Sequence, residues 1–277
     1  MPEGGGRIGL EILRARPPEG VERREVPLLF LHGAFAGAWC WAESFLPGFA
    51  SQGWDSTAFS FRGHGESGGR DSLNGFGIED YVRDLASVLE DFQHPPILIG
   101  HSMGGFVAMR YLEQHGVARA SGLVLMATVP PGGLMGPSLS MMAFQPSLFY
   151  GIGLVQSGHP QAAGVETLKQ ALFTPDTPHG MADLYYSRMT GESQRAVMEL
   201  HGSVRVAPAA LRGALPMQVL GAEKDALIPP AYVRATGRAL GSPAKILPDI
   251  GHGMMLGREA HVSAGAVAQW LADNGFG

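Results

Sequence analysis

The sequence has little of several features that define whole classes of protein. Its 277 residues include one cysteine, Cys40, so no internal disulfide can form. Charged residues make up 16%, the formal net charge is −5 and no long basic run occurs, which argues against a nucleic-acid partner. No apolar run is long enough to span a bilayer, and residues 1–6 lack the apolar core of a signal peptide. We therefore expect a cytoplasmic protein without stable membrane insertion.

Two further absences concern metals and cofactors. The ten histidines are not clustered at the spacing of metal ligands, and no glycine-rich dinucleotide loop is visible. We therefore expect neither a metal nor a cofactor. Nothing in the sequence predicts the oligomeric state.

The sequence is rich in short apolar runs. Hydrophobic residues make up 45% of the chain, enough for one large core. Short, continuously apolar runs are typical of parallel strands that are buried on both faces. They occur at residues 26–31, 57–61, 97–99, 122–126, 217–220 and 244–247. Amphipathic helical patterns lie between them, for example over 81–92 and 259–274. This alternation predicts an α/β fold with a doubly wound, mostly parallel sheet.

The alternation is interrupted between residues 130 and 216. This segment is rich in methionine and aromatic residues, has helical stretches and contains no convincing buried strand. We predict that it is a helical cap inserted into a core domain that comprises residues 1–129 and 217–277.

The most informative motif is GHSMG at residues 100–104. An apolar strand pattern leads into it and a helical pattern follows, which is the setting of a nucleophile elbow. In such an elbow the serine, here Ser102, occupies the tip of a strained turn between strand and helix. Ser67 lies in a second match, GESGG at residues 65–69, but no strand runs into it. Ser102 is therefore the predicted nucleophile.

Two residues that could assist Ser102 follow later strands. Asp225 comes after the strand that ends near residue 221, and His252 comes after the one near residue 247. Loops that follow parallel strands open on one edge of a sheet, so distant residues can meet there. A serine hydroxyl needs a base, and the base needs a carboxylate that orients it. The order serine, acid, histidine predicts a triad of Ser102, Asp225 and His252, with Glu223 as the alternative acid.

The surroundings of this triad can also be predicted. A His-Gly turn, His32-Gly33, follows the first apolar strand. We expect the backbone N–H groups of Ala34 and Met103 to form an oxyanion hole. The apolar side chains that flank the predicted triad suggest a pocket wall of Phe35, Met103, Met254 and Met255. In the cap, Met142 and Phe144 are expected to line the same pocket.

These motifs together resemble those of the α/β-hydrolase superfamily. The resemblance rests on His32-Gly33, RGHGES at 62–67, GHSMGG at 100–105, Asp225 and Gly251-His252. It implies an α/β-hydrolase fold and covers about residues 26–126 and 215–274. The loop HGAFAGAWCW at 32–41 is also similar to that of plant methylesterases and hydroxynitrile lyases. That branch usually has cysteine and histidine where Phe35 and Ala36 stand, which weakens a lyase assignment.

The expected function is that of a serine hydrolase, a carboxylesterase that forms an acyl-enzyme on Ser102. Its substrates would be small to medium, apolar carboxylic esters. The same triad could serve a carbon–carbon bond hydrolase, a thioesterase or a cofactor-free lyase. A ligand-binding protein with a vestigial triad is the alternative from a different class. Active-site labelling at Ser102 separates the enzymes from the binding protein.

Overall fold

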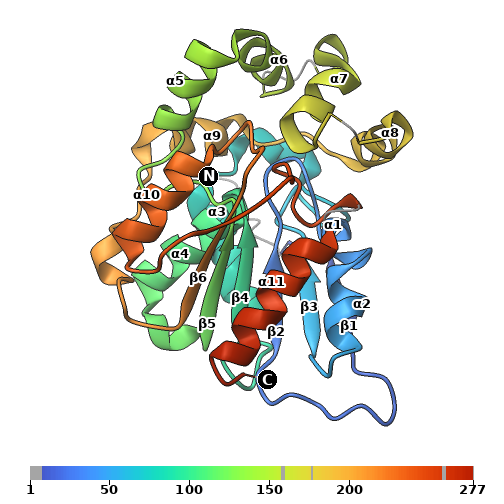
Figure 1. Cartoon of the computed structure of the whole chain (residues 1–277), viewed down its shortest axis with the longest axis vertical. Helices are drawn as coiled ribbons and strands as arrows, with labels where there is room; N and C mark the ends of the chain where they lie inside the picture. Colours follow the sequence, from blue (N-terminus) through green and yellow to red (C-terminus); the bar gives the residue numbers. More distant parts are fainter. Residues whose placement is uncertain (1–7, 157–159, 176, 258–259, 277) are drawn as a thin grey trace, which may run out of the picture.

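A single twisted sheet forms the centre of the molecule. The computed structural model describes residues 8–156, 160–175, 177–257 and 260–276 (Figure 1). Within these residues, seven strands pair in the order β1-β3-β2-β4-β5-β6-β7. Strands β2 to β7 run parallel, and β1 pairs antiparallel with β3 at one edge. The strands are β1 (Ile12–Ala15), β2 (Leu28–Leu31), β3 (Ser56–Phe59), β4 (Ile97–His101), β5 (Gly122–Met126), β6 (Met217–Ala222) and β7 (Lys245–Leu247).

The six predicted strands are confirmed, and the strand β1 was missed. The buried strands β2, β4 and β5 are fully apolar or nearly so, which is why their sequences reveal them. Strand β1 lies at the edge of the sheet, is only partly buried and includes the exposed Arg14. Its sequence therefore has no continuous apolar run.

Helices cover both faces of the sheet (Figure 1). On one face, α1, α2 and α11 pack against alternate strand residues such as Leu28 and Phe30. On the other, α3, α4 and α10 pack against Leu29 and Leu31. The period of two along a strand thus divides the core into two layers. The bounds are α1 (Trp39–Ala42), α2 (Phe45–Ala50), α3 (Ile78–Leu89), α4 (Met103–His115), α10 (Pro230–Leu240) and α11 (Ala260–Asp273). Glu259, where a helix was predicted to begin, lies outside the described residues, as do residues 1–7 and 277 of the predicted core domain.

The chain between β5 and β6 is helical, as its sequence suggested. Its described residues contain no strand, and α5 to α8 gather beyond one end of the sheet (Figure 1). Helices α5 and α6 contain no charged residue. The elements are α5 (Met135–Phe144), α6 (Pro146–Gln156), α7 (Pro160–Leu172), α8 (His179–Arg188), α9 (Gln194–Met198), η3 (Glu199–Ser203) and η4 (Pro208–Ala210). Two short turns elsewhere are η1 (Arg70–Gly75) and η2 (Val117–Arg119). Among the residues described, no helix combines the length and apolar composition needed to cross a membrane.

Candidate active site

Ser102 occupies a sharp turn between β4 and α4. Its backbone angles are φ 50° and ψ −115°, a conformation that costs energy for any residue with a Cβ atom. The turn can form because glycines stand two positions before and two positions after Ser102, at Gly100 and Gly104. A Cβ atom on Gly104 would lie 2.5 Å from the carbonyl oxygens of Leu31 and His32. Strand and helix therefore approach as closely as a nucleophile elbow requires.

Ser67, the alternative nucleophile, is tied into the core. Its Oγ donates a hydrogen bond to the carbonyl of Ser60 at 2.6 Å and accepts one from the N–H of Glu11 at 2.9 Å. The side chain is buried and does not line the cavity at Ser102. This serine holds a loop and is not placed for attack on a ligand in that cavity.

His252 is paired with Asp225 and not with Glu223. His252 Nδ1 lies 2.8 Å from Asp225 Oδ2, and both residues are buried. The other carboxylate oxygen, Oδ1, accepts hydrogen bonds from the N–H groups of Leu227 and Ile228, both at 2.8 Å. Glu223 is exposed and accepts a hydrogen bond from the N–H of Asp249. The carboxylate thus holds the ring with Nδ1–H toward the acid, which leaves Nε2 as the basic nitrogen.

Ser102 and His252 face the same cavity. The cavity has a volume of about 270 Å³, and both residues line it. Among the described residues, neither the Ser102 hydroxyl nor His252 Nε2 has a hydrogen-bond partner, and the two are not bonded to each other. Such bonds are often long without a ligand and shorten when substrate binds.

The two predicted oxyanion donors line this cavity as well. Met103 is the first residue of α4, so its N–H has no partner within the helix and lies at the positive end of the helix dipole. The N–H of Ala34 likewise donates to no residue in the described part of the chain. Both groups are therefore available to a negatively charged oxygen.

Of the side chains predicted to form the pocket, Phe35, Met103 and Met255 line the cavity, and Met142, Phe144 and Met254 do not. Met142 and Phe144 are 48% and 82% exposed and do not line the cavity, whereas Met141 is buried and does. Each helical residue is rotated by about 100° from the one before it, so the inward face of α5 includes Met141 and excludes Met142. Met254 is buried in the core and does not reach the cavity, whereas Met255, predicted together with it, does.

Glu192 is a cavity residue that the sequence analysis missed. It lies between α8 and α9, is buried, and accepts hydrogen bonds at both oxygens. One oxygen lies 3.0 Å from His64 Nε2, and the other accepts a hydrogen bond from the Tyr81 hydroxyl at 2.7 Å. A lone glutamate in a loop carries no local pattern, so no sequence signal could have found it.

Two other histidines near the site are structural. His32 Nδ1 lies 2.7 Å from the carbonyl of Gly33, and its Nε2 accepts a hydrogen bond from the N–H of Phe61. Burial lowers the pKa of His32 to about 3, so the ring is neutral. His101 Nε2 donates to the carbonyl of His252, and burial also lowers the pKa of His101. Within the described residues, no three histidine, cysteine or acidic side chains are grouped as a metal site.

Comparisons with known proteins decide the family. The sequence profile of the α/β hydrolase family matches residues 28–266. The chain belongs to this family. Among solved structures, an esterase from Exiguobacterium antarcticum superposes with a TM-score of 0.75 at 17% identity. The superposition covers 95% of this chain and 96% of that one, which shows a shared fold.

Two curated proteins are similar in sequence over part of their length. The chain is 34% identical over 125 residues to pFDCC methylesterase MES16 of Arabidopsis thaliana, which covers 44% of this chain and 47% of the relative. It is 31% identical over 106 residues to non-heme chloroperoxidase CPO-A1 of Kitasatospora aureofaciens, which covers 38% of each. The chain therefore matches less than half the length of these relatives. The first match confirms the resemblance to plant methylesterases.

Proposed function

We propose that the protein is a serine hydrolase that cleaves carboxylic esters through an acyl-enzyme on Ser102. The observation that carries the proposal is the strained elbow, which presents Ser102 to the cavity that His252 also lines. The His252–Asp225 hydrogen bond supports it, because it leaves Nε2 of the ring free to take a proton. The partial similarity to a methylesterase favours an ester over the other carbonyl substrates.

The reaction would proceed in two steps. In the first, Ser102 Oγ bonds to the ester carbonyl carbon while its proton passes to His252 Nε2. The carbonyl oxygen becomes negative and accepts hydrogen bonds from the N–H groups of Ala34 and Met103. The carbon–oxygen bond to the alcohol breaks, and the alcohol leaves with the proton from His252. Water, deprotonated by His252, then attacks the acyl group and releases the acid and Ser102.

A pair of serine substitutions tests this proposal. Ser102→Ala should lower ester turnover at least about a thousandfold, because only binding and the oxyanion donors remain. Ser67→Ala should change turnover little, since that hydroxyl holds a loop outside the cavity. Activity measured on esters of graded acyl length would also identify the substrate range. Full activity in Ser102→Ala would refute the proposed nucleophile.

We further propose that residues 130–216 act as a cap that sets substrate choice. Side chains from α5, α6 and α7 line the same cavity as Ser102, among them Met141 and Phe149. Met141→Trp should shift the preferred acyl length, by about 1–3 kcal/mol in selectivity. Met142→Trp is the matched control, because that side chain points away from the cavity. Equal acyl-length profiles for the two variants would contradict the cap assignment.

A further inference from the structure

Phe35 has a strained backbone beside the proposed oxyanion donor Ala34. Its φ is 63°, a value that an L-residue with an aromatic side chain rarely adopts. Such a conformation persists only where surrounding contacts fix it. Because Ala34 is the preceding residue, a change at Phe35 would also move the N–H of Ala34.

Both polar backbone groups of Phe35 are held by the segment that connects α8 to α9. The carbonyl of Phe35 accepts a hydrogen bond from the N–H of Thr190 at 3.0 Å. Its N–H donates to Glu192 Oε2 at 3.3 Å. Residues 190 and 192 therefore hold the strained residue from both sides.

The Glu192 carboxylate is itself fully held. Oε2 also faces His64 Nε2, while Oε1 accepts from the Tyr81 hydroxyl and from the N–H of Ser193 at 2.7 Å. Burial alone would raise the pKa of Glu192, but the charge and hydrogen bond of His64, with the Tyr81 and Ser193 bonds, lower it below its usual value. An ionised buried carboxylate needs such pairing, and this one has it at each oxygen.

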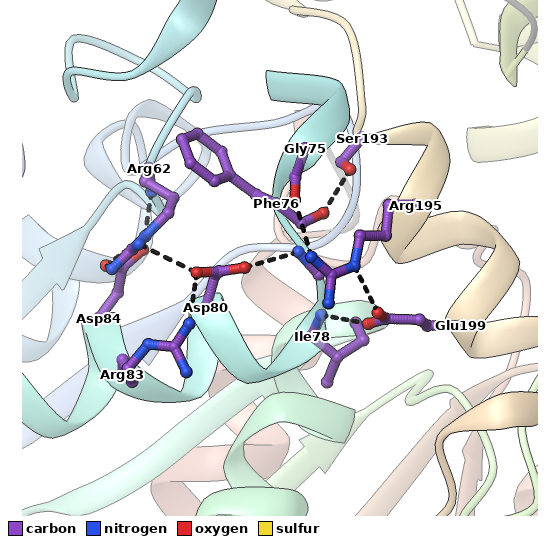
Figure 2. Close-up of polar contacts among 11 residues, drawn as sticks. Arg62, Gly75, Phe76, Ile78, Asp80, Arg83, Asp84, Ser193, Arg195 and Glu199 are labelled. Carbon is purple, nitrogen blue, oxygen red and sulfur yellow. Dashed lines mark hydrogen bonds and ion pairs between the residues drawn. The ribbon is translucent and has the colours of Figure 1, made fainter. Parts of the chain in front are cut away.

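The same chain segment is anchored to the core immediately after Glu192 (Figure 2). The Ser193 hydroxyl donates to the carbonyl of Phe76, and Arg195 donates to that of Gly75. Glu199 accepts a hydrogen bond from the N–H of Ile78 at 2.7 Å and pairs with Arg195. These contacts hold the residues that follow Glu192 against η1 and the start of α3.

We propose that Glu192 is a positioning residue, which fixes the Phe35 backbone and thereby holds the Ala34 N–H where the oxyanion forms. The inference rests on the proposed ester hydrolysis. Protein groups already occupy both Glu192 oxygens: the N–H of Phe35 and His64 at Oε2, and the Tyr81 hydroxyl and the N–H of Ser193 at Oε1. The effect of Glu192 should therefore be on the transition state, since the oxyanion develops only there.

Glu192→Gln tests this inference, with Glu199→Gln as the matched control. An amide at position 192 has only one oxygen, so either the Phe35 or the Ser193 N–H loses its acceptor. If the amide oxygen keeps the hydrogen bonds from the Tyr81 hydroxyl and the N–H of Ser193, the N–H of Phe35 loses its acceptor. We expect kcat to fall by about ten- to a hundredfold, toward the loss caused by removing an oxyanion donor, while KM changes less than threefold. Glu199→Gln keeps an oxygen for Ile78 and should leave kcat within twofold.

A second variant, Glu192→Asp, and amide hydrogen exchange at Phe35 extend the test to the case in which Glu192→Gln does not fold. If Glu192→Gln does not fold, Glu192→Asp keeps the charge but withdraws it by one methylene, and the same fall in kcat is expected. Amide hydrogen exchange at Phe35 should accelerate in either Glu192 variant and not in Glu199→Gln. Hydrogen exchange at Phe35 can be measured even if the wild-type protein shows no Ser102-dependent ester turnover. That outcome would refute the proposed function and not the positioning role of Glu192. Unchanged kcat with unchanged exchange, or equal losses in the Glu192 and Glu199 variants, would overturn the inference.

Discussion

The molecule contains two buried histidine–carboxylate pairs, His252–Asp225 and His64–Glu192, which differ in whether the histidine keeps a ring nitrogen free of hydrogen bonds among the described residues. Their ring-to-carboxylate distances are similar, 2.8 Å and 3.0 Å. His252 uses only Nδ1 in the described structure, and its ring lines the cavity. His64 uses both nitrogens, Nδ1 on the carbonyl of Arg62 and Nε2 on Glu192. Burial beside a carboxylate does not make a histidine a base; a free nitrogen that faces the ligand is also needed.

The partners of His64 fix its protonation. Both partners of His64 are hydrogen-bond acceptors, so both of its nitrogens must carry protons. Burial alone would lower the pKa of His64, but the charge and hydrogen bond of Glu192 raise it above its ordinary value. A ring that is already protonated at both nitrogens cannot accept the serine proton. His64 is therefore suited to hold Glu192, and His252 to exchange a proton.

The largest expected difference is between glutamine substitutions at the two histidines. His252→Gln should lower kcat by about 10⁴- to 10⁶-fold, because the proposed base is lost. His64→Gln should lower kcat by less than about tenfold, since a glutamine can still donate to Glu192. It should instead destabilise the fold, by up to about 3–5 kcal/mol, because the buried Glu192 charge loses the positive charge opposite it. Ester kinetics and urea unfolding of both variants measure the two effects, and a reversed order in kcat would contradict the comparison.

A smaller difference is expected between the acids that follow β6. Asp225→Asn should cost up to about 10⁴ in kcat, because an amide favours the wrong ring tautomer of His252. Glu223→Gln should have a mild effect, since Glu223 is exposed and bonds only the N–H of Asp249 among described residues. Kinetics under identical conditions decide between them. A larger loss in Glu223→Gln would move the acid to that residue.

The smallest expected effect is the pH dependence of stability that His64 supplies. A histidine whose pKa is raised in the folded state stabilises the fold fully below the unfolded pKa, about 6.5, and loses this contribution as the pH rises through the folded value. His64→Gln should therefore destabilise the protein more at pH 6 than at pH 9. Each unit by which the pKa is raised corresponds to about 1.4 kcal/mol of that difference. Urea unfolding at the two pH values measures it, and equal destabilisation would show that folding does not raise the pKa of His64.

Local patterns explain why much of the fold and of the His252–Asp225 pair could be predicted. Strands buried on both faces, such as β2 and β5, are apolar over their whole length. Ser102 follows one strand and precedes one helix, so its motif has an identifiable context. Asp225 and His252 each come after a strand, and a parallel sheet brings such positions to one edge.

The remaining features depend on tertiary contacts that no local pattern reveals. Glu192 is 128 positions from His64 and 111 from Tyr81, and only the folded chain brings them together. The inward face of α5 could not be deduced either. Its apolar residues occur on several sides of the helix, with Met135, Leu139 and Met142 exposed and Met141 buried. The helical period gives the spacing of residues on one side of α5, but it does not say which side faces the cavity.

Active-site labelling tests most directly whether Ser102 is a nucleophile that His252 activates. The wild-type protein is incubated with a small phosphonate ester, and the adduct is counted and located by mass spectrometry. We expect one phosphonate per chain, on Ser102, with the labelling lost in Ser102→Ala and greatly slowed in His252→Gln. An adduct on Ser67, or ester turnover that continues while Ser102 stays unlabelled, would contradict the account.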